Sequence, residues 1–538
     1  MAISLGIDLG TTNSCAAVAT PTGVEFILGP QGERVHPSVV AFPAGRGVVV
    51  GADAKLYRLT EPLSVIHSAK RLIGQNIRAP LVQLALAGLQ YKVVEGTNQQ
   101  PVVDLRERQM TMPQISSLVL LHLKRCAERQ LGVSINDAVI TVPANFTDAQ
   151  RQATKEAGRL AGLHVARLIN EPTAAALAYG FGRNQNQLIC VFDFGGGTFD
   201  VSILKLNGEV FEVLASDGDF FLGGDDLDRA LAELLAAECN RVLRFDPRKH
   251  PVTMMKLMMG AEAIKCHLSE HDGAEGEIDG IELPNGKVGS LPFVVGRTQF
   301  ETLIHGYVSR TIEVTNQVLA FAGLSPDRIS EVLCVGGSTR IPIVRQRLAE
   351  VFRREPNVRI NPDEVVAQGA AIQAGSLSGS IIAGSGMGRR DAVLTNAHSP
   401  LLYGGATPAR ALARPVLLDV TPSTLAIQTA GGYAEKLLEK NAPIPIERSR
   451  IFSTARDHQT RVEIDCCRGE SRRYTENEPL GTLVLDSLPA KPRGELHIEV
   501  CFRVDSDGIL HVRATDAESG ARQEATLTVI GAPQRESA

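Results

Sequence analysis

Two short segments carry the residue types that bind phosphate and magnesium. Residues 7–14 (IDLGTTNS) and 192–199 (FDFGGGTF) both place an aspartate after an apolar run and follow it with glycine and threonine. Glycine lets a backbone loop approach a phosphate closely, hydroxyl groups add hydrogen-bond donors, and carboxylates hold Mg²⁺. One such segment also suits an ordinary turn, but two in one chain favour a phosphate site with two matching halves.

Two carboxylates and one lysine would suffice for phosphoryl transfer to water, which needs positioning and charge neutralisation more than covalent chemistry. We expect Asp8 and Asp193 to hold Mg²⁺ through water. Lys70 would contact the γ-phosphate, and Glu171 would order water on the opposite side. Taken alone, a lysine is usually solvated and a glutamate before proline usually begins a helix. Lys70 and Glu171 are better supported as site residues because the two aspartates predict a phosphate site in the same chain.

The elements that position these residues can be predicted from the chain between them. Apolar runs at 3–9 and 188–194 predict strands that lead into the two turns. Helices are expected over 117–132 and over 148–162, the second after the cap Thr147. Strands that alternate with helices indicate an α/β domain over residues 1–378, with two related halves that face one cleft.

The pattern changes after residue 378. Residues 379–414 are rich in Gly, Ser, Ala and Arg and predict a long flexible connector. From residue 415, alternating runs such as 496–504, followed by a turn at Asp507 and Gly508, predict an antiparallel β-sandwich over 415–530. A short tail would occupy 531–538, and nothing helical is expected after the sandwich.

Composition excludes some functions. The chain has 55 Lys and Arg against 60 Asp and Glu, so its net charge of -5 gives no electrostatic basis for binding nucleic acid or a membrane. It has no signal-peptide pattern and no apolar run near the about 18 residues that span a bilayer, so we expect a soluble, cytoplasmic monomer. The nine cysteines show no C-x-x-C or Cys/His ligand spacing, and we expect reduced, buried thiols without metal.

Long strings of the chain resemble the heat shock protein 70 chaperones of the DnaK type. In order, they are IDLGTTNSC, SAKRLIG, ITVPANFTDAQRQATKEAG, LINEPTAAALAYG, FDFGGGTFDVSIL, GDFFLGGDDLD, VLCVGGSTRIP and INPDEVVAQGAAIQAG. The resemblance covers nearly all of residues 3–378. It implies an α/β actin-like ATPase domain, with two lobes built on ribonuclease H-like repeats, followed by an all-β substrate-binding sandwich. We expect no C-terminal helical lid.

The resemblance assigns roles to individual residues of the nucleotide site. The catalytic residues would be Asp8, Lys70, Glu171, Asp193 and Thr198. The phosphate loops would comprise Gly10, Thr11, Thr12, Asn13, Gly195, Gly196, Gly197, Thr198, Gly223 and Gly224. The adenosine pocket would comprise Glu262, Lys265, Ser269, Gly336, Gly337, Ser338, Arg340 and Asp363. The ligands implied are ATP or ADP, Mg²⁺ and K⁺.

Residues 416–432 (VLLDVTPSTLAIQTAGG) and the later strings KNAPIP, FSTARDHQTRVEIDCCRGE and DSDGILHVRATD resemble the family's linker and sandwich. An extended client would satisfy its main chain there while apolar side chains enter a pocket. The peptide-binding residues would be Ile427, Ala430, Phe452, Ala455, Val462 and Ile464. Ala430 and Ala455 stand where larger side chains often arch over the peptide, so we expect an open groove and rapid client exchange. Ordinary sandwich core is the alternative for the apolar positions.

The resemblance also implies coupling and partners. Interdomain coupling would use Pro143, Arg151, Leu417, Leu418 and Asp419, and a J-domain partner would dock at Arg167, Asn170 and Thr173. A nucleotide-exchange factor and unfolded polypeptide clients complete the expected partners. The function implied is an ATP-dependent chaperone that captures extended hydrophobic segments and takes part in the stress response. The alternatives are another actin-fold ATPase of the sugar-kinase kind, and an ATP-binding holdase or exchange factor without turnover.

Overall fold

The computed structural model describes residues 3–21, 23–105, 108–183, 186–379, 414–516 and 522–526. The predicted connector, apart from its two end residues, and the predicted tail lie outside the described residues. The chain after residue 526, on which the predicted absence of a lid depends, lies outside them too, so that absence and the domain boundaries stay predictions. Among the described residues, no helix is both long and apolar enough to cross a bilayer.

Two mixed sheets with related topology form the two lobes of the first part of the chain. In each sheet, a three-stranded antiparallel meander is extended by a parallel strand next to its first strand. The first sheet contains β1 (Ser4–Asp8), β2 (Asn13–Thr20), β3 (Gly23–Phe26), β4 (Val35–Pro37), β11 (Asp137–Val142) and β12 (His164–Asn170). The second contains β13 (Asn186–Phe194), β14 (Phe199–Asn207), β15 (Val210–Asp219) and β18 (Glu331–Val335). The repeat matches the two related halves that the sequence predicts.

Two helices join the lobes where the sheets meet. α10 (Val365–Ser378) packs on β1 and β2, and α5 (Glu171–Gly180) packs on β13 and β14 and against α10. A Cβ added to Gly369 would lie 1.8 Å from the Ala174 carbonyl oxygen, and one added to Gly6 would lie 2.0 Å from the Ala371 nitrogen. These glycines therefore let the helices and β1 approach one another more closely than any side chain would allow.

The predicted helices of the first lobe are confirmed. α4 (Asp148–Leu160) follows Thr147, which forms a capping box with Gln150. α3 (Met112–Leu131) begins five residues before the predicted start at residue 117, because Thr111 and Gln114 form a capping box there. It ends at Gly132, which adopts the left-handed conformation common after helix ends.

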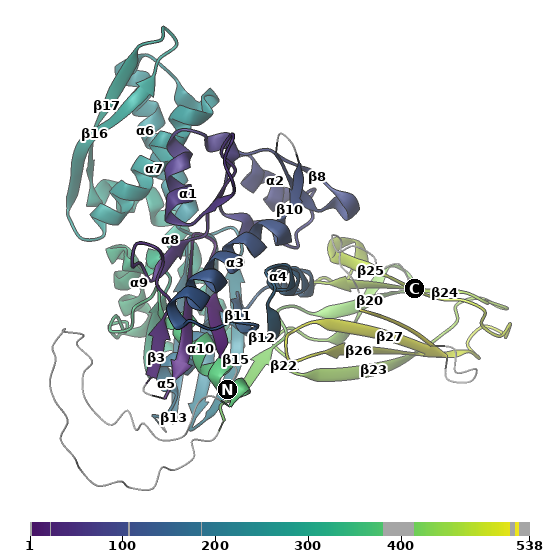
Figure 1. Ribbon diagram of the computed structural model, residues 1–538. Coiled ribbons are helices and arrows are strands. Elements are labelled where there is room, and N and C mark those ends of the chain that lie inside the picture. Colours follow the sequence, from purple (N-terminus) through teal and green to yellow (C-terminus); the bar gives the residue numbers. More distant parts are fainter. Residues whose placement is uncertain are drawn as a thin grey trace, which may run out of the picture.

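The outer parts of the two lobes carry smaller elements. In the first lobe they are α1 (Ala52–Leu56), α2 (Pro80–Leu86), β5 (Val40–Ala41), β6 (Val49–Val50), β7 (Val65–Ile66), β8 (Val93–Glu95), β9 (Pro101–Asp104) and β10 (Gln109–Thr111). In the second they are α6 (Gly224–Leu243), α7 (Pro251–Leu268), β16 (Gly273–Glu282), β17 (Val288–Gly296), α8 (Arg297–Phe321) and α9 (Pro342–Phe352). The β16–β17 hairpin projects from the top of the second lobe (Figure 1).

Two four-stranded antiparallel sheets form the sandwich that extends to one side of the lobes (Figure 1). One contains β20 (Leu425–Thr429), β21 (Tyr433–Leu438), β24 (Val462–Arg468) and β25 (Glu478–Leu485), and the other contains β23 (Ile446–Ser453), β26 (His497–Val504), β27 (Leu510–Asp516) and β28 (Arg522–Thr526). Phe502 and Val512 are fully buried between them. The predicted strand at 496–504 and the turn at Asp507 and Gly508 are confirmed.

A strand that follows the connector joins the second lobe rather than either sandwich sheet. β19 (Val416–Val420) pairs in parallel with β15, with Leu417 opposite Phe211, and antiparallel with β22 (Pro443–Ile444). Leu417 is buried in a cluster with Phe211 and Val420. The sandwich is thereby held against the lobes, beside α4 and β12 (Figure 1).

Candidate active site

The two predicted phosphate turns meet face to face. Residues 9–12 connect β1 to β2, and residues 195–198 connect β13 to β14. A Cβ added to Gly196 would lie 1.9 Å from Thr12 Oγ1, and one added to Gly197 would lie 2.3 Å from Thr11 Cγ2. The backbone of the second turn thus lies directly against the threonines of the first, which leaves amides and hydroxyls of both turns at one place.

An inner cavity of about 90 Å³ lies between the turns. The predicted catalytic residues that line it are Asp8, Lys70, Glu171, Asp193 and Thr198. From the predicted phosphate loops, Gly10, Thr11, Thr12, Asn13, Gly195 and Gly196 line it as well. The structure therefore brings together residues that are up to 190 positions apart, because the two sheets place the ends of β1 and β13 at the same cleft.

Lys70 and Glu171 form a buried ion pair inside this cavity. Lys70 Nζ donates to Glu171 Oε1 at 2.5 Å, and the two side chains are only 7% and 8% exposed. Lys70 lies in a short 3₁₀ turn (Ala69–Arg71), and Glu171 is the first residue of α5. A buried pair of this kind is held in one geometry and is little screened by solvent, which suits a positioning role.

Carboxylates outnumber cations around the inner cavity. Burial, followed by the charge of Glu171, raises the pKa of Asp8 to about 7, although Asp8 also accepts a hydrogen bond from Thr141 Oγ1 at 2.9 Å. The same two causes, burial first, raise the pKa of Asp193 and of Asp200 well above the usual range. A divalent cation would relieve this crowding of negative charge, so the donor set fits one.

A larger outer cavity of about 560 Å³ shares Thr11, Thr12 and Asn13 with the inner one. The predicted adenosine-pocket residues that line it are Glu262, Lys265, Ser269, Gly337, Ser338, Arg340 and Asp363, while Gly336 lines the inner cavity. Arg340 pairs with Asp363 at 2.6 Å, and Lys265 pairs with Asp228 at 2.8 Å. The two connected cavities suit a long ligand with an anionic end and a planar end.

Three predicted phosphate-loop glycines, Gly197, Gly223 and Gly224, are not among the residues that line either cavity. Gly224 N donates to the Gly195 carbonyl oxygen at 3.0 Å, and a Cβ added to Gly223 would lie 2.5 Å from the Gly196 carbonyl oxygen. Gly223 and Gly224 thus pack against the backbone of the second turn. The start of α6 packs on the turn, and the predicted role of both glycines in binding the nucleotide stays a prediction.

Sequence reasoning overlooked several residues that shape the site. Arg71 Nε donates to the Gly197 carbonyl oxygen at 2.8 Å, and its guanidinium pairs with Asp226 at 2.5 Å. Asp200 accepts from the Asn145 side chain at 3.2 Å. Both residues stand next to predicted site residues in the sequence, since Arg71 follows Lys70 directly and Asp200 follows the second glycine-rich segment directly.

Asp507, at the turn between β26 and β27, connects the sandwich to the first lobe. Its carbonyl oxygen accepts from Arg151 Nη1 at 3.2 Å, and its carboxylate pairs with Lys155 and accepts from Leu168 N at 3.0 Å. Asp148 of the first lobe also pairs with Arg468 at 3.4 Å, and Asp217, on β15 of the second lobe, pairs with Lys440 at 2.7 Å.

The residues predicted for coupling and for J-domain docking lie together at this interface. Arg151, 2% exposed, donates to Asn170 Oδ1 at 2.7 Å, and Thr173 Oγ1 donates to Asp419 Oδ1 at 2.5 Å. Asn170 and Thr173 are therefore buried against Arg151 and the linker, whereas Arg167 is partly exposed. Pro143 is also buried, and Leu417 and Leu418 belong to β19.

The predicted peptide-binding residues are divided between core and surface. Ile427 and Ile464 are buried in the sandwich core, and Phe452 and Val462 pack against it. Ala430 and Ala455 are exposed. The apolar positions are thus continuous with the core, while the two alanines present small side chains at the surface.

Two lobes of related topology, one phosphate turn from each and a carboxylate-rich cavity between them define an ATPase of the actin-like class, here joined to a β-sandwich. The chain matches the family model described as "Hsp70 protein" over residues 4–537. It is 41% identical over 528 residues to "Chaperone protein DnaK" of Buchnera aphidicola subsp. Schizaphis graminum (strain Sg), which covers 97% of this chain and 78% of that relative.

The chain therefore belongs to the Hsp70 family. It is an ATP-dependent chaperone and an ATPase, which binds ATP and ADP with a divalent metal and acts on unfolded polypeptides with co-chaperones. The sugar-kinase alternative is thereby set aside.

Proposed function

We propose that this chain hydrolyses Mg-ATP in the inner cavity and transmits the nucleotide state to the sandwich through the start of α5. One observation carries this proposal. Glu171 faces the cavity, while its neighbour Asn170 is held by Arg151 and Thr173 is held by Asp419 of the linker. A small shift of Glu171 toward or away from a bound γ-phosphate would therefore alter contacts on both sides of the helix start.

Asp8 and Asp193 are the proposed holders of Mg²⁺ through water, supported by the excess of buried carboxylates around them. The bound cation would neutralise charge on the phosphates. K⁺ is proposed as a second ion of the same site. Lys70 would donate to the γ-phosphate while it holds Glu171, and Thr198 would add a hydroxyl donor. Glu171 would orient the water that attacks phosphorus as the bond to the β–γ bridging oxygen breaks.

We also propose which residues contact the partners, because membership of the family does not specify them. Arg167 is the proposed direct contact for a J-domain, since it is the partly exposed member of the three predicted residues. Asn170 and Thr173 would act on such a partner through Arg151 and the linker. A nucleotide-exchange factor is proposed on the same family grounds. The cytoplasmic location, monomeric state and stress response stay predictions.

Turnover of ATP is expected to rise about fivefold or more when an unfolded peptide is added, since coupling between two sites is commonly of that size. Steady-state phosphate release with and without a peptide measures this rise, with a sugar as the control ligand. A rate that is unaffected by peptide would contradict the proposed coupling. A rate that responds to the sugar would instead favour kinase chemistry.

The predicted peptide site at Ala430 and Ala455 is expected to release peptide quickly in both nucleotide states. Because these alanines present small side chains, little can cover a bound peptide, and we expect release to slow by less than about 100-fold from ATP to ADP. Stopped-flow release of a fluorescent peptide measures the two rates. The variant Ala430→Met should slow release about tenfold in ADP, whereas Ala434→Met on the neighbouring strand β21 should have little effect. Wild-type release that slows by more than about 100-fold from ATP to ADP would refute the predicted open groove.

A further inference from the structure

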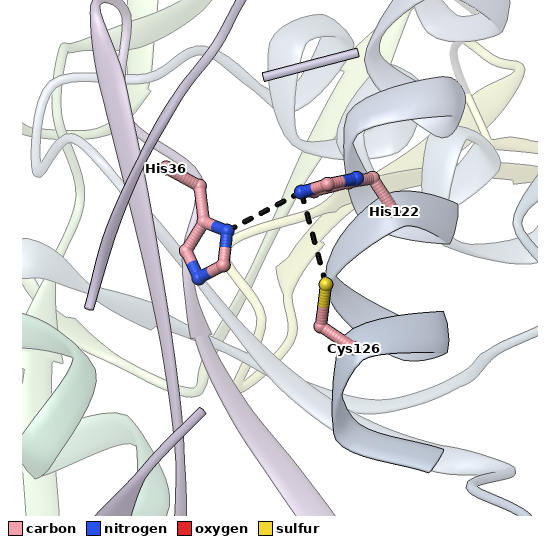
Figure 2. Close-up of side chains that lie close together, drawn as sticks. All are labelled: His36, His122 and Cys126. Carbon is pink, nitrogen blue, oxygen red and sulfur yellow. Dashed lines mark hydrogen bonds between the residues drawn. The ribbon is translucent and has the colours of Figure 1, made fainter. Parts of the chain in front are cut away.

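Three donor side chains gather in the first lobe, outside the nucleotide site. His36 lies on β4, and His122 and Cys126 lie one turn apart on α3 (Figure 2). His36 Nδ1 is 3.3 Å from His122 Nε2, and His122 Nε2 is 3.8 Å from Cys126 Sγ. All three donor atoms lie within 4.8 Å of one another. We propose that they bind a late first-row divalent cation, Zn²⁺ above all.

The spacing is close to that of a tetrahedral zinc site. Zinc binds imidazole nitrogen at about 2.0–2.1 Å and thiolate sulfur at about 2.3 Å, which places neighbouring nitrogens about 3.3 Å apart and nitrogen and sulfur about 3.6 Å apart. The observed 3.3 Å between the two imidazoles fits directly, while the 3.8 Å from His122 to the sulfur, which lies within 4.8 Å of His36 Nδ1, requires Cys126 to move closer when a cation binds. Two nitrogens and one sulfur are a donor set that zinc favours over magnesium or calcium.

A second, independent feature supports a ligand role for His36. Its Nε2 lies 3.2 Å from the carbonyl oxygen of Ile27, and His36 and Ile27 are fully buried. A carbonyl oxygen can only accept, so Nε2 carries the proton and Nδ1 presents its lone pair toward His122. Histidines that bind metals are commonly held by such a hydrogen bond from the other ring nitrogen.

The surroundings leave the site accessible. His122 is partly exposed, and Gly51, at φ 84°, faces its Nε2 atom, where an added Cβ would lie 3.4 Å away. The two imidazole nitrogens and the thiol offer three donors, and a fourth ligand such as water would have to approach from the partly exposed side of His122.

The site lies directly behind the first phosphate turn. In the antiparallel pairing of β4 with β2, His36 lies opposite Ser14. Ser38, two residues after His36, donates from Oγ to the Gly10 carbonyl oxygen at 2.8 Å. A cation would tie β4 to α3 and so stabilise the framework of that turn. The sequence analysis overlooked the four-residue spacing of His122 and Cys126, which places both on one side of a helix. Its expectation that every cysteine is buried is wrong for Cys266, which is exposed.

Cobalt titration of the full chain tests the proposal, in a Cys266→Ser background that removes the exposed thiol beside the stacked His267 and His271. We expect one equivalent of Co²⁺ to give thiolate-to-cobalt charge-transfer absorption, as the Cys126 thiol gives its proton to solvent, whereas Co²⁺ held by the carboxylates of the inner cavity gives no such band. Zn²⁺ should displace the cobalt. The additional change Cys126→Ser should abolish the charge-transfer band, and His122→Gln should weaken binding about 10- to 100-fold or more.

Thermal melting shows whether each variant is folded, so that loss of the cobalt band can be distinguished from loss of structure. Zn²⁺ should raise the Tm of the background protein by more than it raises the Tm of the folded Cys126→Ser variant, because both proteins keep the carboxylates of the inner cavity. The variant His267→Ala should keep both the cobalt band and the Tm shift. Absence of a charge-transfer band in the background protein, or a band that survives Cys126→Ser, would overturn the site and leave the three residues as a chain of hydrogen bonds between neutral groups.

Discussion

Replacing Lys70 with alanine is expected to slow single-turnover ATP hydrolysis by about 100- to 1,000-fold, the usual effect of removing one donor aimed at developing charge. Of the described residues that line the inner cavity, Lys70 alone is cationic, and it holds Glu171 at 2.5 Å. Its loss removes a contact with the γ-phosphate and releases the proposed water-orienting carboxylate. Rapid-quench measurement of hydrolysis after mixing enzyme in excess with ATP gives the rate.

Lys92→Ala is the matched control for this variant. Lys92 also pairs with a carboxylate of the same lobe, Asp104, at 2.5 Å, but its side chain is 70% exposed and lines neither cavity. An exposed pair contributes little, so hydrolysis should stay within about twofold of the parent. Calorimetry should show that both variants still bind Mg-ATP. Hydrolysis at the parental rate in Lys70→Ala would remove Lys70 from the proposed catalytic residues.

Features encoded by neighbouring residues could be predicted from the sequence. The capping box at Thr147 and Gln150 fixes the start of α4, and it involves residues three apart. The glycine-rich turns follow from the residue types within each turn, and their duplication showed that two halves form one cleft. The inner cavity could be anticipated in part for the same reason, because about half of the residues that line it come from residues 7–14 and 192–199.

Contacts between distant segments could not be predicted in this way. Asp507 and Gly508 are recognisable as a turn, but Arg151, which donates to Asp507, is 356 positions away along the chain. Residues 416–420 (VLLDV) are mostly apolar, but their composition does not say which sheet they join, and here they pair with β15. His36 and His122 meet across 86 positions for the same reason. Such pairings depend on the packing of whole elements.

Asp507→Ala is expected to remove most of the difference between peptide release rates in ATP and ADP, and to do so without loss of ATP binding. The Asp507 carboxylate is 12% exposed, pairs with Lys155 and accepts from Leu168 N. Removing one partner of such a pair commonly costs about 2–5 kcal/mol, which exceeds the about 1–3 kcal/mol typical of coupling between sites. The docked arrangement should then no longer be favoured when ATP binds.

Asp486→Asn is the control on the same sandwich, because Asp486 pairs with Arg461 and both side chains are about 60% exposed. Its ratio of release rates should match the parent. Asp419→Ala should reproduce the effect of Asp507→Ala, since Asp419 holds Thr173 on the other side of Glu171. If both act through the start of α5, the double variant should lose no more coupling than either single one. Additive losses would instead indicate two independent routes, and an unchanged ratio in Asp507→Ala would show that this turn does not transmit the nucleotide state.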